Sequence, residues 1–171
     1  MLNKFLPDEH VESIFDIQPD KLRELGIKGV ITDLDNTLVE WDRPDATPEL
    51  SKWVTLMREQ GIYITIVSNN KEKRVKRFSD PVEIPFIYKA RKPMTKAFRH
   101  AMRDMKLRKE EIVIVGDQIL TDVLGGNRLG VHTILVVPIA KNDGWLTRFN
   151  RRMEKYLLAW MKRKGMIFWE E

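Results

Sequence analysis

Short, uninterrupted apolar runs rich in β-branched residues alternate along this chain with stretches of helical periodicity. The clearest runs are 28–32, 62–67, 112–115 and 131–137, and a weaker one covers 86–88. Continuous apolar runs are typical of strands that are buried on both faces of a parallel sheet, whereas half-exposed strands alternate apolar and polar residues. The pattern predicts an α/β fold, namely an open, doubly wound parallel sheet of about five strands with right-handed crossovers.

Amphipathic helices are predicted between these strands. Residues 47–60 carry apolar side chains at positions i, i+3, i+4 and i+7, and Thr47 is placed to cap the helix. Residues 93–105 carry a similar apolar stripe, and shorter helices are predicted at 71–78 and 120–129.

Composition restricts the chemistry that is open to the chain. Its 171 residues are 43% hydrophobic and 32% charged, which is typical of a globular domain with a real core. The absence of cysteine excludes disulfides, thiolate metal sites and cysteine nucleophiles. The opening segment has no apolar stretch typical of a secretory signal, and no run approaches the roughly 18 apolar residues of a membrane span. We therefore expect a cytoplasmic protein, at most peripheral at the inner membrane face.

The net charge of +5 is unevenly distributed. Residues 1–70 carry 7 basic and 13 acidic side chains, whereas residues 89–109 carry 9 basic and 1 acidic, and residues 141–171 carry 8 basic and 4 acidic. This asymmetry indicates an anionic partner, although a solvated basic surface explains any single run equally well. No specific nucleic-acid-binding motif is present.

Polar residues stand directly after four of the predicted strands. They are Asp33, Asp35 and Thr37 after the first strand, Ser68 and Asn69 after the second, Lys92 after the third, and Asp117 and Asp122 after the fourth. In an open α/β sheet, ligands bind at the carboxyl ends of the strands. We therefore expect these side chains to meet in one crevice.

The residue types in this set point to phosphoryl chemistry. Crowded carboxylates repel one another, and a ligand set of oxygens alone suits Mg²⁺. One carboxylate can attack phosphorus, and a second can transfer protons. The hydroxyls of Thr37 and Ser68 and the ammonium of Lys92 can hold the phosphoryl oxygens. Taken one at a time, these residues also suit turn formation, helix capping or a solvated surface.

The motifs carry a family resemblance. Asp33–Leu38 (DLDNTL), Ser68, the pair Lys92–Pro93 and Gly116–Asp122 (GDQILTD) resemble, in order, the four motifs of the haloacid-dehalogenase-like (HAD) phosphohydrolases, and they span most of residues 28–137. More closely, the chain resembles the YqeG family of HAD subfamily IIIA. That family is related to the mitochondrial-type phosphatidylglycerophosphate phosphatases.

The resemblance implies a Rossmann-like core and roles for individual residues. Asp33 would be the nucleophile that forms an aspartyl-phosphate, and Asp35 would be the general acid/base. Mg²⁺ would be held by Asp33, by Asp35 through its main-chain carbonyl, and by Asp117, with Asp122 supporting the site. Ser68 and Lys92 would bind phosphate, and Lys92 is preferred over the nearby Lys89 because only Lys92 precedes a proline.

We expect a core over residues 1–140 and a basic amphipathic extension over residues 141–171. No folded cap domain is expected, because one helix nearly fills residues 38–62 and only 24 positions separate Ser68 from Lys92. An uncovered site suits a large or surface-bound phosphorylated substrate. Phosphatidylglycerophosphate is the first candidate, and a protein- or nucleic-acid-linked phosphate comes next.

The segment 144–164 predicts an amphipathic helix. An arc of about 120° holds seven apolar residues and a neighbouring arc is basic. The apolar residues are Trp145, Leu146, Phe149, Met153, Tyr156, Leu157 and Trp160, and the basic residues are Arg148, Arg151, Arg152, Lys155 and Lys162. Such a helix can lie on an anionic membrane, or it can dock its apolar face on the helices that flank the sheet.

Two other functional classes use similar features. A phospho-accepting regulatory domain also combines a carboxylate cluster, Mg²⁺ and a lysine, but Asp35 disfavours it because a general acid/base turns the phosphoenzyme over. An RNA-binding or assembly factor with a vestigial site would use the basic runs. Neither the oligomeric state nor a role for residues 1–27 follows from the sequence.

Overall fold

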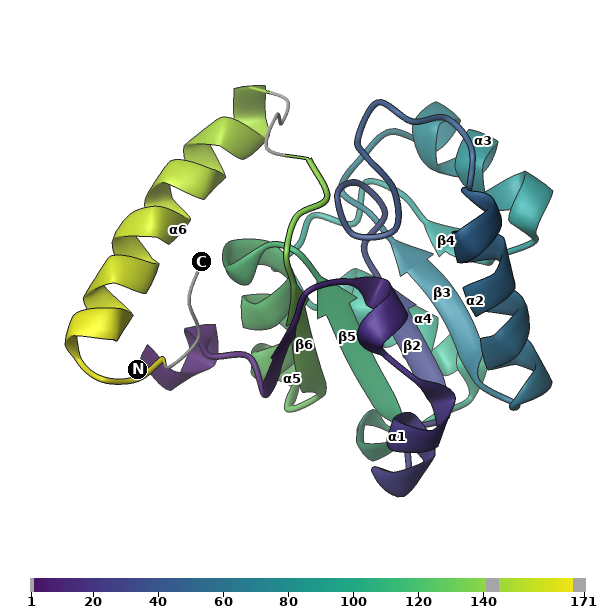
Figure 1. Cartoon of the computed structure of the whole chain (residues 1–171), viewed down its shortest axis with the longest axis horizontal. Coiled ribbons are helices and arrows are strands. Elements are labelled where there is room, and N and C mark those ends of the chain that lie inside the picture. Colours follow the sequence, from purple (N-terminus) through teal and green to yellow (C-terminus); the bar gives the residue numbers. More distant parts are fainter. Residues whose placement is uncertain (1, 141–144, 168–171) are drawn as a thin grey trace.

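The computed structural model describes residues 2–140 and 145–167 (Figure 1). Its elements, in chain order, are η1 (Leu2–Phe5), β1 (Glu9–Val11), η2 (Ile14–Asp16), α1 (Pro19–Glu24), β2 (Gly29–Thr32), α2 (Pro48–Glu59), β3 (Tyr63–Val67), α3 (Glu72–Val82), β4 (Phe86–Ile87), α4 (Lys96–Met105), η3 (Lys109–Glu111), β5 (Ile112–Gly116), η4 (Ile119–Val123), α5 (Leu124–Leu129), β6 (His132–Val136) and α6 (Trp145–Arg163). The label η4 denotes a π-helical turn, and η1 to η3 are 3₁₀ turns.

All pairings between these strands are parallel, and the strands follow the order β1-β6-β5-β2-β3-β4. Thr32, the last residue of β2, pairs with Val115 of β5 on one side and with Ile66 of β3 on the other. The chain moves from β2 outward through β3 and β4 and then returns to β5 on the opposite side of β2. The strand order therefore reverses beside β2, which is where open α/β sheets form their binding crevice.

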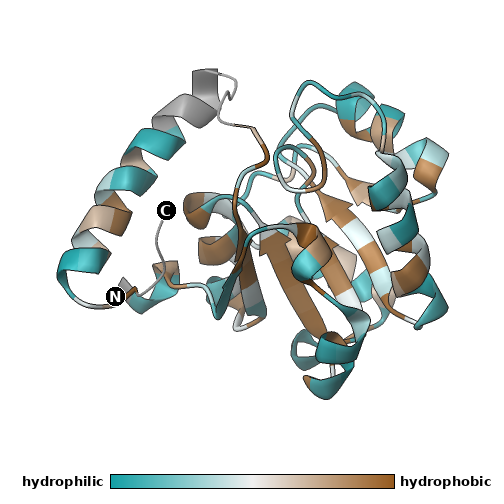
Figure 2. Cartoon of the chain, in the orientation of Figure 1, coloured by the Kyte–Doolittle hydropathy of each residue, from teal (hydrophilic) through white to brown (hydrophobic). Residues whose placement is uncertain are grey.

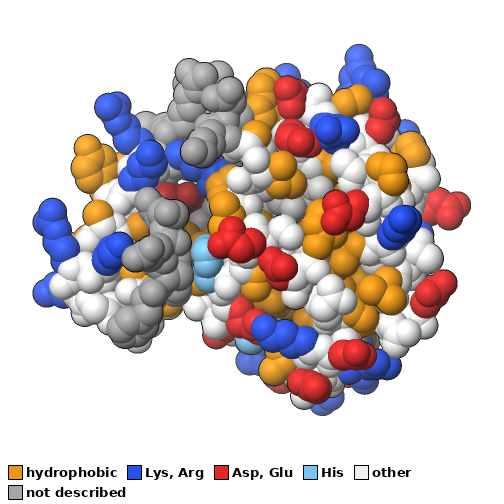
Figure 3. Space-filling model, in the orientation of Figure 1, with side chains coloured by type: hydrophobic (Ala, Val, Ile, Leu, Met, Phe, Trp, Pro, Cys, Tyr) orange, Lys and Arg blue, Asp and Glu red, His pale blue; other side chains and the backbone are white. Residues whose placement is uncertain are grey.

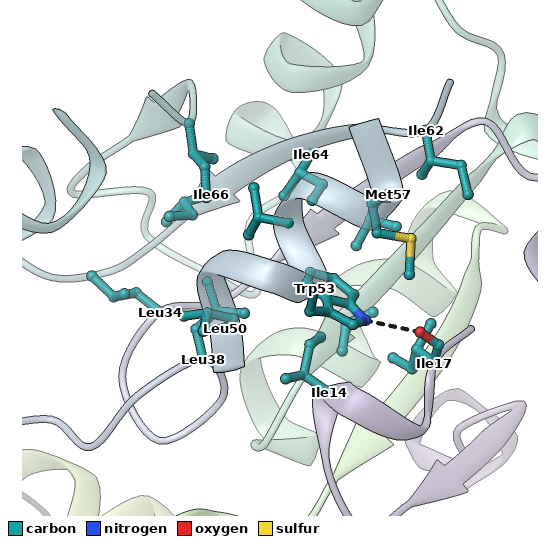
Figure 4. Close-up of a cluster of buried hydrophobic side chains, with 14 of the residues drawn as sticks. Ile14, Ile17, Leu34, Leu38, Leu50, Trp53, Met57, Ile62, Ile64 and Ile66 are labelled. Carbon is teal, nitrogen blue, oxygen red and sulfur yellow. Dashed lines mark hydrogen bonds between the residues drawn. The ribbon is translucent and has the colours of Figure 1, made fainter. Parts of the chain in front are cut away.

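Both faces of the sheet are covered by apolar packing, as the continuous strand patterns predict. On one face, side chains of α2, α3 and the N-terminal segment pack on the strands, and Figure 4 shows Trp53 of α2 donating its indole N–H to the carbonyl oxygen of Ile17, 2.9 Å away. On the other face, Phe98 and Ala101 of α4 pack on Ile31 and Ile114. Figure 2 shows β5 as hydrophobic along nearly its whole length.

The predicted helix over 47–60 forms as α2, and its start is fixed by the expected cap. The Thr47 hydroxyl accepts a hydrogen bond from the backbone N–H of Leu50 at 3.1 Å, and Pro48 occupies the first helical position. Elsewhere the bounds differ from the prediction. α3 continues to Val82 rather than ending at Phe78, and α4 begins only at Lys96.

The sheet has six strands, one more than the sequence predicts. The additional strand, β1, contains only Glu9, His10 and Val11 and pairs with β6 at the edge of the sheet. Three residues with one apolar side chain give no strand pattern. The pairing comes from tertiary contacts instead, including hydrogen bonds between Asp8 and Thr133.

The C-terminal helix α6 lies beyond β6 and α5, apart from the sheet (Figure 1). Leu157 and Leu158 are half-buried against the cluster of Ile119, Val123 and Leu135. The expected boundary at 140 adjoins residues 141–144, which lie outside the described residues, as do the side chains of Trp145, Leu146, Arg148 and Phe149. None of the described helices is both long enough and apolar enough to cross a membrane.

Candidate active site

The carboxyl ends of the central strands bring the predicted acidic residues together. Asp33 follows β2 and donates its backbone N–H to the carbonyl oxygen of Val115 in β5, 3.0 Å away. Asp117 directly follows β5, and Asp122 lies in η4. Carboxylate oxygens of these three aspartates lie within 4.8 Å of one another, and all three residues are buried. Residues far apart in the sequence therefore form one acidic cluster.

A close backbone approach makes room for this cluster. Gly116 ends β5, and a Cβ atom at this position would lie 2.2 Å from the carboxylate of Asp122. The Asp122 carboxylate also accepts the backbone N–H of Gln118 at 3.2 Å. The absence of a side chain at Gly116 therefore allows the η4 carboxylate to reach the end of the sheet.

Lys92 lies between two of the three carboxylates. Its Nζ is 3.0 Å from Oδ1 of Asp33 and 2.6 Å from Oδ1 of Asp122, and its side chain is 2% exposed. Burial alone lowers the pKa of Lys92, but the charges of Asp122 and Asp33 outweigh it and raise the pKa above its ordinary value. Lys92 is therefore a permanent cation inside the cluster.

Burial is the largest influence on the pKa of Asp117 and of Asp122. It raises the pKa of Asp117, and repulsion from Asp33 and Asp122 adds to this effect while Arg151 opposes it. Burial also raises the pKa of Asp122, with Lys92 opposing. When ionised, the three carboxylates outnumber the two cations that contact them among the described residues, Lys92 and Arg151, so a further cation would stabilise their charged forms.

The carboxylate of Asp35 is held apart from the three clustered acids. Its Oδ1 accepts a hydrogen bond from Nε of Arg74 at 3.0 Å and forms an ion pair with Nη2 of the same residue at 2.9 Å. Its Oδ2 accepts a hydrogen bond from the side-chain amide of Asn70 at 2.8 Å. Burial raises the pKa of Asp35, with Asn70 and Arg74 opposing and Asp33 adding to the rise. Its side chain remains 20% exposed, so this carboxyl is more accessible to solvent than the three clustered acids.

Three of the residues predicted to bind substrate also organise the protein itself. The Thr37 hydroxyl donates to Oδ1 of Asp117 at 3.1 Å and so links the loop after β2 to the loop after β5. Asn69 accepts the backbone N–H of Lys92 at 2.7 Å and donates to its carbonyl oxygen at 3.3 Å. Ser68 is buried, and its hydroxyl oxygen accepts the backbone N–H of Asn70 at 3.1 Å.

The C-terminal helix contributes two contacts that the sequence did not predict. Arg151 donates to the main-chain oxygen of Asp117 at 2.9 Å and also forms an ion pair with the carboxylate of that residue. Glu154 accepts the backbone N–H of Leu120, in η4, at 2.9 Å. Glu154 is the single acidic residue between 144 and 164, and this is the one sequence signal that could have indicated an inward-facing carboxylate. α6 is therefore attached to the segment that carries Asp117 and Asp122.

The comparisons with known proteins point to one family of hydrolases. Residues 89–154 match the model of the HAD-hydrolase-like family. The chain is 66% identical, over 100% of both lengths, to the "Probable phosphatase YqeG" of Bacillus subtilis. It is 27% identical to the Arabidopsis thaliana "Phosphatidylglycerophosphate phosphatase 1, chloroplastic/mitochondrial" over 94% of this chain, but it spans only 49% of that longer protein.

Solved structures share the fold. A putative beta-phosphoglucomutase from Thermotoga maritima superposes with a TM-score of 0.56 at 12% identity, over 72% of this chain and 92% of its own. The cobalt-bound deoxy-D-mannose-octulosonate 8-phosphate phosphatase of Haemophilus influenzae gives a TM-score of 0.53 at 17% identity, over 81% and 90%. These likenesses concern the fold alone.

The 66% identity over the whole chain identifies the family, whereas the structural likenesses identify only the fold. It confirms the resemblance that the four motifs indicate, and with it the expectation that the protein is an enzyme of the hydrolase class. The chain belongs to the HAD-like hydrolases, in the group that includes this Bacillus subtilis relative.

Proposed function

We propose that this protein is a Mg²⁺-dependent phosphatase that hydrolyses a phosphate monoester through an aspartyl-phosphate on Asp33. The observation that supports this most strongly is the meeting of Asp33, Asp117 and Asp122 with Lys92 at the carboxyl edge of the sheet, all of them buried. Hydrolysis of phosphate monoesters is among the slowest of uncatalysed reactions, so it needs a nucleophile, a cation and a charge clamp together.

The acidic cluster fits Mg²⁺. Asp33, Asp117 and Asp122 offer carboxylate oxygens within 4.8 Å of one another, with neither sulfur nor imidazole among them, and hard oxygen ligands are those that Mg²⁺ prefers. When bound there, the metal ion would supply positive charge to the phosphoryl oxygens and to the Asp33 carboxylate. Its ligands would be Asp33, Asp117 and Asp122, and the family resemblance adds the main-chain carbonyl of Asp35.

Asp33 is the nucleophile in this mechanism. Its Oδ1 accepts the backbone N–H of Leu34 at 2.8 Å and the ammonium of Lys92 at 3.0 Å. Both contacts fix the carboxylate plane, and we assign the attack on phosphorus to the other oxygen, Oδ2. The bond from Oδ2 to phosphorus forms as the bond to the ester oxygen breaks.

Asp35 supplies and removes protons. In its protonated form it donates its proton to the leaving ester oxygen, and the resulting carboxylate then takes a proton from the water that attacks the phosphoenzyme. Burial favours the protonated form that the first step needs, because it raises the pKa of this carboxyl. Arg74 and Asn70 hold the carboxylate in place through both oxygens.

Substitution of each aspartate tests these roles. Asp33→Asn and Asp35→Asn should each lower the turnover of p-nitrophenyl phosphate by at least about 100-fold. Asp42→Asn, an exposed aspartate in the same loop, should leave turnover unchanged. Full activity of Asp33→Asn, or of the wild type in excess chelator, would defeat the assignment.

The lifetime of the phosphoenzyme separates a phosphatase from a phospho-accepting regulatory domain. Acid quenching after mixing with substrate should trap phosphate on Asp33, and this phosphoenzyme should decay at least as fast as the steady-state turnover. A phosphoenzyme that persists without turnover would instead favour the regulatory function.

For the substrate, we propose an anionic phospholipid with a terminal phosphate, and phosphatidylglycerophosphate first. The plant relative with that activity supports it at 27% identity over 94% of this chain. Three exposed apolar side chains also belong to segments next to the site residues. Trp41 lies in the loop after β2, Met94 is two residues after Lys92, and Ile139 donates its N–H to the carbonyl oxygen of Asn36. A rim of this kind suits a ligand that has acyl chains.

Comparison of substrates tests this choice. The protein should hydrolyse phosphatidylglycerophosphate in mixed micelles with a kcat/KM at least about 100-fold above that for glycerol phosphate or sugar phosphates. The reason is that only the lipid substrate makes contacts through its lipid body. Preference for a soluble phosphate or a phosphopeptide would remove the lipid proposal and leave the phosphatase chemistry intact.

A further inference from the structure

The helix α6 packs on the rest of the molecule with one face. Glu154, Leu157, Leu158 and Met161 follow the spacing i, i+3, i+4 and i+7, which places them on one side of a helix. Glu154 and Met161 are buried, and Leu157 and Leu158 contact the cluster around η4. This core-facing side includes Leu158, which lies outside the apolar arc that the sequence displays, and a buried carboxylate.

Of the apolar arc that the sequence displays, Leu157 meets the core, whereas the other three members whose side chains are described face away from it. Met153, Tyr156 and Trp160, at i, i+3 and i+7, are 49%, 70% and 42% exposed. Docking on the helices that flank the sheet would have buried them. The described structure therefore leaves three large apolar or amphipathic side chains of one helix face without a partner among the described residues.

Basic side chains flank this outer face. Arg152, Lys155 and Arg163 are exposed on α6, and no carboxylate of the described residues forms an ion pair with any of the three. In Figure 3 blue and orange side chains stand out together along the edge of the molecule that α6 forms. Cations that do not pair within the protein remain available to an anionic partner.

We propose that this outer face, defined by Met153, Tyr156, Trp160, Arg152, Lys155 and Arg163, docks on an anionic phospholipid bilayer with α6 lying parallel to the surface. Tryptophan and tyrosine have an apolar body and a polar tip, which suits them to the boundary between acyl chains and headgroups. The arginine and lysine side chains reach the lipid phosphates, and each increases the affinity roughly fivefold.

A bilayer fits this face better than a nucleic acid does. The central side chains Met153 and Tyr156 are more exposed than most surface apolar groups of this protein, and a methionine thioether offers no ring on which a base can stack. A bilayer takes up the methionine, both aromatic rings and the flanking cations together, because apolar burial and charge attraction act across the same plane.

The docked face and the active site share one helix. Arg151, beside Arg152, contacts Asp117 on the opposite side of α6 from Tyr156. The proposal therefore extends the proposed function to the surface on which its substrate lies, although vesicle binding needs no catalysis. Deletion of α6 is a poor test, because it also removes Arg151 and Glu154 from their contacts with the site.

The test is sedimentation of the full chain with vesicles. Wild type should bind vesicles of phosphatidylcholine mixed with phosphatidylglycerol, should release them at high salt, and should bind vesicles of phosphatidylcholine alone at least about tenfold more weakly. The triple variant Met153→Ser, Tyr156→Ser, Trp160→Ser should bind the anionic vesicles at least about tenfold more weakly than wild type. The triple variant Arg152→Gln, Lys155→Gln, Arg163→Gln should lose on the order of 100-fold.

A matched control separates this face from general surface hydrophobicity. Leu25, Leu56 and Tyr63 are 46%, 37% and 59% exposed. Leu25 follows α1, Leu56 lies on α2 and Tyr63 begins β3, all away from α6. Leu25→Ser, Leu56→Ser, Tyr63→Ser should bind vesicles as wild type does. Turnover of soluble p-nitrophenyl phosphate reports folding in every variant.

Absence of vesicle binding by wild type, or unchanged binding by both α6 variants, overturns the proposal. Salt-sensitive binding of a mixed-sequence RNA with none to vesicles overturns it as well and favours a nucleic-acid partner. Because hydrolysis and sedimentation are separate measurements, loss of one leaves the other interpretable.

Discussion

The Asp35 carboxylate accepts a hydrogen bond from Arg74 on one oxygen and from Asn70 on the other. Arg74→Ala removes one of these contacts and lets the general acid move away from the leaving group. We expect kcat for p-nitrophenyl phosphate to fall at least about tenfold, with partial recovery in Arg74→Lys, which keeps the charge but not the planar fork. Arg77→Ala is the matched control, because Arg77 lies on the same helix and is exposed. Equal effects of the two alanine variants would contradict a positioning role for Arg74.

Glu154 predicts a pH dependence of stability. Burial raises its pKa from 4.5 to about 7, against the opposing hydrogen bond from Leu120. A carboxyl that binds its proton more tightly in the fold stabilises the fold fully below its unfolded pKa, and this stability is lost as the pH rises through about 7. A shift of this size corresponds to about 3 kcal/mol.

Denaturant titrations from pH 4 to about pH 8 measure this effect. The free energy of unfolding of the wild type, relative to that of Glu154→Gln, should decline over this range by up to about 3 kcal/mol. The exposed Glu59→Gln should follow the wild-type pH profile. Parallel profiles for wild type and Glu154→Gln would show that Glu154 titrates normally.

At the level of single residues, the sequence indicates the acids and Lys92 because each lies in a segment that follows a predicted strand. Arg74 and Asn70 give no such signal. Arg74 is one of five cations in the run 71–77, and nothing in that run marks the one that turns toward Asp35. Thr37 and Asn69 were predicted as substrate ligands from their position, whereas their described hydrogen bonds tie the loops of the site to one another.

Among the elements, α6 has the most direct effect on the site, through Arg151. Arg151→Ala leaves the buried Asp117 carboxylate without this partner, so we expect the metal-free protein to lose about 1–3 kcal/mol of stability. Mg²⁺ should restore more stability to this variant than to wild type, because a cation replaces the lost charge. Thermal melts in chelator and in excess Mg²⁺ measure both values. Arg152→Ala, the exposed neighbour, should melt as wild type does.

The elements with strong apolar periodicity were predictable, and those set by tertiary contacts were not. β2, β3, β5 and β6 coincide with continuous apolar runs, and α2 begins at its expected cap. β1 is too short and too polar for a pattern. The segment predicted as a helix from Leu120 instead opens with the π-helical turn η4, which places Asp122 against Gly116. π-helical turns are frequent at functional sites and have no simple sequence signature.

For the whole molecule, Mg²⁺ should act as a cross-link. Its predicted ligands come from the ends of β2 and β5 and from η4, so binding favours the folded chain over the unfolded one. At an Mg²⁺ concentration about 100 times its Kd, we expect a gain of about 2.7 kcal/mol in the free energy of unfolding. Thermal melts should show this rise in wild type and in the exposed control Asp104→Asn, and its loss in Asp117→Asn. An equal rise in Asp117→Asn would place the ion elsewhere.

The overall arrangement follows from the order of strands and strand-end residues, because a parallel sheet with a reversal beside β2 gathers those ends. The orientation of the last helix does not follow in the same way. Its sequence shows an apolar arc, yet the side that meets the core carries Glu154 on the N–H of Leu120 and Arg151 on Asp117, beside Leu158 and Met161, which lie outside that arc. The apolar arc alone therefore does not predict this rotation.

The attachment of α6 by Arg151 and Glu154 has a practical consequence for handling this protein. A purification tag could displace the last helix from the core, and a protease could remove it. Either change would take Arg151 away from Asp117 while leaving the sheet intact. Such a sample would show normal strand content by spectroscopy but altered binding of metal and substrate. The integrity of the C-terminal helix should therefore be measured whenever a specific activity is quoted.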